Sequence, residues 1–243
     1  MWLLILSYLV QAALIVHVIK TGRNQLWIWV LLLLPGAGPI AYVAVELLPA
    51  MLRSRTAQRT ARGLKKAMDP GAELRRAESE ARVTSNVASR QRYAEELVRH
   101  GRYDDAIAQY NQALSGLYEH DPNLMLGLAQ AQFGKGDASA ARATLDELIR
   151  LNPDFRSPNG HLLYARALEA EGNVTKALEE YRVLAPSYPG AEAAVRYAQL
   201  HEKQGRRSEA QQVARELLEQ ARIAPGHYRR AQRSWLEAAQ RLL

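Results

Sequence analysis

The 243-residue sequence contains no cysteine and only two phenylalanines. Without cysteine there is no disulfide bond, no thiolate zinc site and no cysteine nucleophile. The sequence also lacks a Walker loop, a serine nucleophile elbow, an HExxH motif and an EF-hand loop. Its six histidines are scattered, and no pair has metal-ligand spacing beside carboxylates. We therefore predict a protein that is not an enzyme, with no cofactor, no metal and no small-molecule substrate.

Formal charge is unevenly distributed, although the net value is +7. Residues 87–243 are nearly balanced, with 21 Lys or Arg against 20 Asp or Glu. The excess is concentrated in residues 53–66, which carry six basic residues and no acid directly after a long apolar region. Such runs are typical of the cytoplasmic side of a bilayer, so we expect contact with anionic lipid and not with nucleic acid. The residues expected to make it are Arg53, Arg55, Arg59, Arg62, Lys65 and Lys66.

Two apolar segments occupy the first fifty residues. Residues 2–19 have no formal charge, and residues 26–48 carry only Glu46. At about 1.5 Å per residue, each is long enough as a helix to match the hydrocarbon thickness of a bilayer. We predict a transmembrane hairpin over residues 1–50. Because the basic flank follows the second helix, the positive-inside rule places both termini in the cytoplasm.

This hairpin resembles the N-terminal membrane region of cardiolipin synthases and other phospholipase D-type proteins. The residues that carry this resemblance are Trp27, Trp29, Pro35, Gly38 and Tyr42. The resemblance implies an anchor of the same shape without the chemistry of that enzyme group. Its catalytic signature is H-x-K followed four residues later by Asp, and here Ser208 stands in the Asp position after residues 201–203.

An internal repeat occupies the rest of the chain. Four glycines recur at intervals of 35, 36 and 33 residues, namely Gly101, Gly136, Gly172 and Gly205. An alanine stands seven residues before each glycine (Ala94, Ala129, Ala165, Ala198) and five residues after it (Ala106, Ala141, Ala177, Ala210). A period of this size is typical of a stacked helical array. Each repeat is expected to form two antiparallel helices, with the glycine ending the first.

The Ala-x6-Gly-x4-Ala frame, the aromatic residues around it and the prolines that end the repeats resemble the tetratricopeptide repeat (TPR) family. This resemblance implies an all-α solenoid of about four helix pairs over residues 87–243, closed by a capping helix at 226–243. Residues 51–86 are then a basic juxtamembrane segment followed by either a linker or a helix that precedes the first repeat.

In that family, partner peptides usually lie along the concave face formed by the first helices of the repeats. The register places the following residues on this face: Gln91, Glu95, Arg99, Asn123, Leu126, Gln130, Phe133, Leu162, Arg166, Val195, Gln199 and Lys203. We expect this face to bind a protein partner, with Arg166 near its centre. The clamp of lysine, arginine and asparagine that some members use for a C-terminal carboxylate is not reproduced.

The sequence thus predicts a non-catalytic scaffold or assembly factor, anchored as a multi-pass protein in a bacterial inner membrane with its repeats in the cytoplasm. Two alternatives stay open. The hairpin suggests an accessory subunit of a phospholipid-synthesising membrane enzyme. A reversed topology would instead make the repeats a periplasmic module in envelope or cytochrome assembly.

Overall fold

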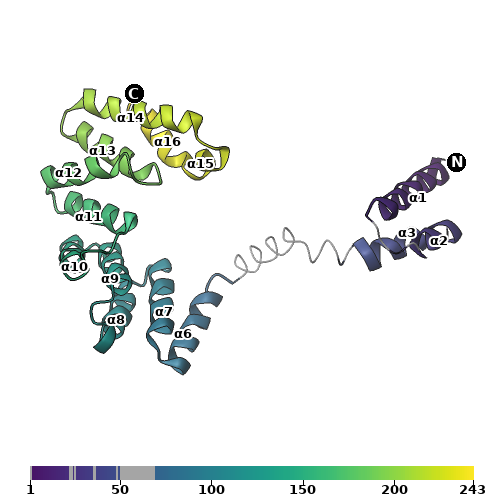
Figure 1. Cartoon of the computed structure of the whole chain (residues 1–243), viewed down its shortest axis with the longest axis horizontal. Helices are drawn as coiled ribbons and strands as arrows, with labels where there is room; N and C mark the ends of the chain where they lie inside the picture. Colours follow the sequence, from purple (N-terminus) through teal and green to yellow (C-terminus); the bar gives the residue numbers. More distant parts are fainter. Residues whose placement is uncertain (1, 22–23, 25, 35–36, 48, 50–68) are drawn as a thin grey trace. The chain divides into compact units, whose positions relative to one another are not determined.

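The computed structural model describes residues 2–21, 24, 26–34, 37–47, 49 and 69–243. In this part of the chain all regular elements are helical (Figure 1). The chain divides into two compact units, Met1–Ala72 and Glu73–Leu243, and each is described by itself. The basic segment at 53–66, and with it the predicted lipid contacts, lies outside the described residues.

The first unit is a small cluster of helices. It comprises α1 (Trp2–Thr21), α2 (Leu26–Leu33), α3 (Ala37–Tyr42) and a π-helical turn, η1 (Val43–Leu47). Its core is formed by Val18, Leu31 and Tyr42, which are fully buried. The Tyr42 hydroxyl lies 3.0 Å from the Nδ1 atom of His17. Helices α1, α2 and α3 therefore contribute to one shared core.

The predicted transmembrane hairpin is not what this unit shows. The segment expected as one helix over 26–48 is divided, and α2 is only eight residues long, about 12 Å. A Cβ atom on Gly38 would lie 2.7 Å from the carbonyl oxygen of Val30, so α3 packs directly on the backbone of α2. Within the described residues, no helix combines the length and the apolar character needed to cross a bilayer. The assignment as a multi-pass inner-membrane protein with cytoplasmic repeats was therefore wrong.

The second unit is a stack of antiparallel helix pairs (Figure 1). The first helices of the pairs are α7 (Val87–Arg99), α9 (Pro122–Lys135), α11 (Pro158–Ala170) and α13 (Glu192–Lys203). The second helices are α8 (Tyr103–Ala113), α10 (Ala138–Leu151), α12 (Val174–Leu184) and α14 (Arg207–Ile223). A 3-10 turn, η2 (Gly116–Tyr118), lies between α8 and α9.

The four periodic glycines end the first helices by the same hydrogen-bonding scheme. Their φ angles are 71°, 96°, 79° and 73°, in the left-handed region that favours glycine. After each glycine, the next backbone N–H turns back to a carbonyl five residues earlier, as from Asp137 to Gln132 at 3.0 Å and from Asn173 to Leu168 at 2.9 Å. This is the Schellman ending of a helix, and it sends the chain directly into the second helix of the pair.

The eight periodic alanines lie in the contacts between helices. Each of them is at most 1% exposed. Larger side chains fill the space beside them, and Tyr110 and Tyr181 of the second helices are also buried. Because an alanine keeps two helix axes close, these positions set the spacing of the stack.

Both ends of the stack are covered by further helices. At the start, α6 (Ala72–Thr84) buries Ala77. Its Leu74 packs against the core cluster that contains Leu97 and Tyr110. At the other end, the segment expected as one capping helix forms α15 (Gly226–Ala231) and α16 (Arg233–Gln240). Trp235 and Leu236 pack against the core cluster that contains Val195 and Leu217, as expected for a cap. The Gln232 side chain between α15 and α16 accepts a hydrogen bond of 3.0 Å from the backbone N–H of Ala191, at the start of α13.

The glycine endings can be tested by one substitution made at two sites. Gly136→Ala is expected to lower the free energy of unfolding by about 1–2 kcal/mol, because φ is 96° there and an L side chain is disfavoured. Gly226→Ala is the matched control, since Gly226 lacks a positive φ and has open space where a Cβ would lie. Urea unfolding of the full chain measures both. Equal destabilisation by the two substitutions would contradict the assignment.

Candidate functional site

The first helices α7 and α9 enclose a cavity of about 360 Å³ on one face of the stack. Six residues expected on the concave face line it: Gln91, Glu95 and Arg99 from α7, and Asn123, Leu126 and Gln130 from α9. We call this the amide groove, because three of these six side chains are amides. These six are residues that the helical register, together with the TPR resemblance, placed on one face of the stack.

Tyr110 of α8 also lines the amide groove, although it was not among the residues expected on the concave face. A Cβ atom on Gly127 would clash with the Tyr110 ring, so the glycine lets this ring lie directly against α9. Burial raises the pKa of Tyr110, and the negative charge of Glu95 raises it further. The hydroxyl therefore stays protonated at neutral pH and offers a hydrogen bond, not a base. The glycine in α9 was the sequence signal that could have revealed this contact.

The polar side chains of the amide groove differ in how far they are already engaged. The Gln91 amide donates to the Glu95 carboxylate at 3.1 Å, and the Arg99 guanidinium forms an ion pair with Glu96. The side chains of Asn123 and Gln130 are exposed and make no hydrogen bond to any described residue. These two amides are therefore free to bind an incoming group.

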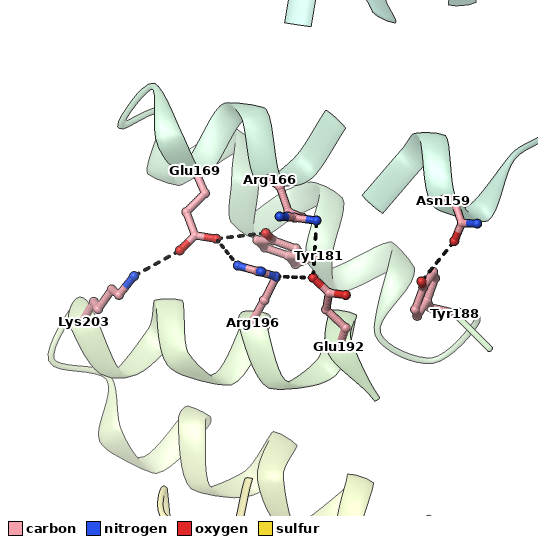
Figure 2. A network of polar contacts seen from close by, with 8 residues as sticks. All are labelled: Asn159, Arg166, Glu169, Tyr181, Tyr188, Glu192, Arg196 and Lys203. Carbon is pink, nitrogen blue, oxygen red and sulfur yellow. Dashed lines mark hydrogen bonds and ion pairs between the residues drawn. The ribbon is translucent and has the colours of Figure 1, made fainter. Parts of the chain in front are cut away.

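The remainder of the first-helix face is occupied by a network of ion pairs between α11 and α13 (Figure 2). Arg196 donates to Glu192 at 2.7 Å, and Arg166 lies 3.7 Å from the same carboxylate. Glu169 lies 3.1 Å from the Lys203 ammonium and 3.9 Å from the Arg196 guanidinium. Neighbouring charges on this part of the face thus neutralise one another.

Aromatic rings hold the arginines of this network from the other side. The Arg166 guanidinium lies over the Phe133 ring, 4.8 Å from its centroid, and that of Arg196 lies 5.4 Å from the Trp235 ring centroid. Such contacts stabilise a cation and fix its position. Arg166, expected near the centre of a binding face, is therefore half-buried and already held by Phe133 and Glu192.

The other predicted face residues have different environments. Leu162 and Val195 are only 4% and 1% exposed and belong to the hydrophobic core, because they point toward neighbouring helices and not toward the face. Gln199 is half-buried, and Lys203 is exposed apart from its ion pair. The structure thus brings the six residues of the amide groove together and places Arg166 and Lys203 in the ion-pair network, apart from that groove.

No arrangement for metal binding occurs in the described part of the chain, where no three His, Asp or Glu side chains are grouped for it. His201 of α13 is the one histidine of this part that is buried, at 7% exposed. Its ring lies edge-on to Tyr197 with centroids 4.5 Å apart, and its Nδ1 atom has no hydrogen-bond partner among the described residues. Burial lowers the pKa of His201, and the nearby charge of Arg206 lowers it further. The folded protein therefore holds this imidazole neutral.

The buried imidazole has a consequence for acid stability. Because its folded pKa is below the ordinary value of about 6.5, the unfolded chain binds the proton more readily. Its contribution to stability is complete above that pH and is lost as the pH falls below it. In thermal unfolding from pH 7.5 to pH 5, His201→Leu should therefore lose less stability than the original chain. An identical fall for both chains would show that His201 does not titrate on unfolding.

Stacked antiparallel helix pairs, with alanines in the contacts and left-handed glycines between the helices of each pair, define a TPR α-solenoid. Folds of this class typically serve as non-catalytic modules for protein–protein interaction. The family model described as tetratricopeptide repeat matches residues 97–159. This match begins at the end of α7 and covers the whole second repeat.

One curated relative is the cytochrome c-type biogenesis protein CycH of Rhizobium meliloti (strain 1021). It is 37% identical over 95 residues, which cover 38% of this chain and 24% of the relative. The match thus spans about a quarter of the length of that protein. None of the relatives named here is a cardiolipin synthase or a phospholipase D-type protein.

Solved structures of similar fold support the class. MamA has a TM-score of 0.52 at 20% identity, covering 61% of this chain and 86% of MamA. TTC0263, a thermophilic TPR protein of Thermus thermophilus, has a TM-score of 0.52 at 20% identity, and the match covers 73% of this chain and 96% of TTC0263. YrrB, described as a TPR protein with an unusual peptide-binding site, has a TM-score of 0.51 at 16% identity, and the match covers 76% of this chain and 88% of YrrB. At these identities the similarity concerns the fold.

Proposed function

We propose that this chain is a non-catalytic binding protein that holds an extended segment of a partner protein in the amide groove. The observation that carries the proposal is the pair of free amides, Asn123 and Gln130, on the exposed wall of a cavity of about 360 Å³. An amide side chain has both donors and an acceptor. The main chain of an extended peptide presents both kinds of group, so the two surfaces are complementary.

The other residues that line the groove support the same occupant. Tyr110 forms an apolar floor with a protonated hydroxyl, and Leu126 adds apolar surface beside it. Glu95 and Arg99 place one charge of each sign on α7. A partner segment would thus be held by its backbone and by one or two apolar side chains, with no requirement for a net charge.

The ion-pair network explains why we place the partner at α7 and α9 and not along the whole face. Glu169 and Glu192 are each shared between two basic side chains. A partner that entered there would have to displace these ion pairs and the stacked arginines. The two exposed amides that make no hydrogen bond to a described residue, Asn123 and Gln130, line the amide groove.

A second candidate concerns the process that the partner serves. We propose assembly of c-type cytochromes, and what supports it is the 37% identity to the biogenesis protein CycH over 95 residues. Nothing in the described structure favours an accessory role in phospholipid synthesis, since that idea depended on the transmembrane hairpin.

The amide groove can be tested by removing its two free amides. In Asn123→Ala/Gln130→Ala, capture of the partner by cross-linking in the native host should fall roughly thirtyfold, because two lost hydrogen bonds at about 1 kcal/mol each weaken binding by about 2 kcal/mol. Mass spectrometry then identifies what the original chain captured. A component of cytochrome c biogenesis among the captured proteins would support the second candidate.

The matched control is Gln212→Ala/Gln220→Ala, which removes two exposed amides from α14 outside the groove. It should capture as much partner as the original chain. Circular dichroism checks that both double variants remain folded. Undiminished capture by a folded Asn123→Ala/Gln130→Ala chain would show that the partner binds elsewhere.

A further inference from the structure

A second cavity, of about 470 Å³, lies between α10, α11 and α12. Its floor consists of Leu145, Leu148 and Leu184, all buried. It shares only Leu126 with the amide groove, and its other lining residues lie in α10, α11, α12 and the connections beside them. We call it the apolar groove. No part of the proposed function uses it.

The walls of the apolar groove expose more apolar surface than the floor. Ile149 at its edge is 55% exposed, Pro158 is exposed and Phe155 is half-buried. Tyr164 adds an aromatic face, and its hydroxyl donates to Asp146 at 2.9 Å. Burial and this hydrogen bond raise the pKa of Tyr164 to about 12, so its hydroxyl stays uncharged at neutral pH. The volume is within the range of sites that hold a ligand.

The rim of the apolar groove carries a positive charge with no acidic partner. The exposed Arg156 guanidinium donates to the backbone carbonyls of Pro153 at 2.5 Å and Phe155 at 3.4 Å, and it meets no carboxylate among the described residues. The one carboxylate in the lining, Glu180, is engaged by the His161 ring at 2.6 Å. A carboxylate of a ligand could therefore pair with Arg156 without displacing an existing ion pair.

The first turn of α11 contributes to the same rim. Pro158 and Gly160 both line the groove, and Ser157 caps the helix by accepting the Gly160 N–H at 3.0 Å. The positive end of a helix favours a nearby negative group. Arg156 and this helix end thus give one side of an apolar cavity the same electrostatic preference.

We propose that the apolar groove binds a partner peptide through one large apolar side chain, with an adjacent Asp or Glu of the peptide paired to Arg156. The apolar side chain covers Ile149, Phe155 and the buried leucines below them. The acidic neighbour supplies the carboxylate that Arg156 lacks. The groove is then a second interaction surface of the solenoid, with a preference in charge that the amide groove does not have.

The test uses a displayed library of random 12-residue peptides, selected on the immobilised full chain after removal of peptides that bind its Ile149→Glu variant. The enriched peptides should share a large apolar residue next to Asp or Glu. Their affinity for the original chain and for variants is then measured by fluorescence anisotropy. Ile149→Glu and Arg156→Glu should each weaken binding at least about tenfold.

Matched controls separate the groove from general effects of charge. Val183→Glu places the same new charge at an apolar position of α12 that is 57% exposed and does not line the groove. Arg222→Glu reverses an exposed charge on α14. Both should bind the peptides as the original chain does, and so should Asn123→Ala/Gln130→Ala. The amide-groove variant therefore tests the proposed function, and the Ile149→Glu and Arg156→Glu variants test this inference, so each can fail without the other.

Three results would overturn the proposal. One is the absence of any enriched peptide. Another is a set of enriched peptides that lack Asp and Glu, or that bind the Arg156→Glu variant as tightly as the original chain. The third is a concentration-dependent dimer of the original chain, seen by analytical ultracentrifugation, that Ile149→Glu dissociates. That result would show that a second copy of the chain covers the groove in place of a peptide.

Discussion

Close packing of helices at eight buried alanines is the constraint on which the second unit depends. Each alanine keeps neighbouring helices near enough for the larger residues beside it, such as Tyr110 and Tyr181, to be buried as well. The glycines that end the first helices contribute to the same packing. A residue in the left-handed conformation ends the first helix and reverses the chain, so the second helix packs antiparallel to it. The short repeat thus produces a regular stack, and the stack aligns the first helices on a common face.

That alignment creates surfaces of different character on one solenoid. Between α7 and α9 the face is hollow, with free amides above a tyrosine floor. Between α11 and α13 it is closed by ion pairs and by arginines stacked on aromatic rings. The cavity between α10, α11 and α12 is apolar with a basic rim. The same repeat therefore supports distinct surfaces, because the exposed positions vary while the alanines and glycines do not.

In the first unit, the length of an apolar segment was a poor guide to whether that segment crosses a membrane. The apolar length of residues 26–48 predicts a helix that crosses a bilayer, yet the structure places α3 against α2 through Gly38. Backbone approach of this kind depends on contacts between segments. An apolar run that folds onto itself has the same composition as one that spans a bilayer, so composition could not separate the two.

The sequence by itself determined the helical repeat and the glycine that ends each first helix, and with the TPR resemblance it placed six residues of the amide groove on one face. These features follow from local rules: the period of the glycines, the size of alanine and the register of a helix. Only the tertiary structure decided that Leu162 and Val195 are buried, that Arg166 is held by Phe133 and Glu192, and that Tyr110 reaches the groove. Those outcomes depend on how far one helix is rotated and shifted against the next, and on which side chains then meet across the gap. Periodicity within a single helix carries no information about that geometry.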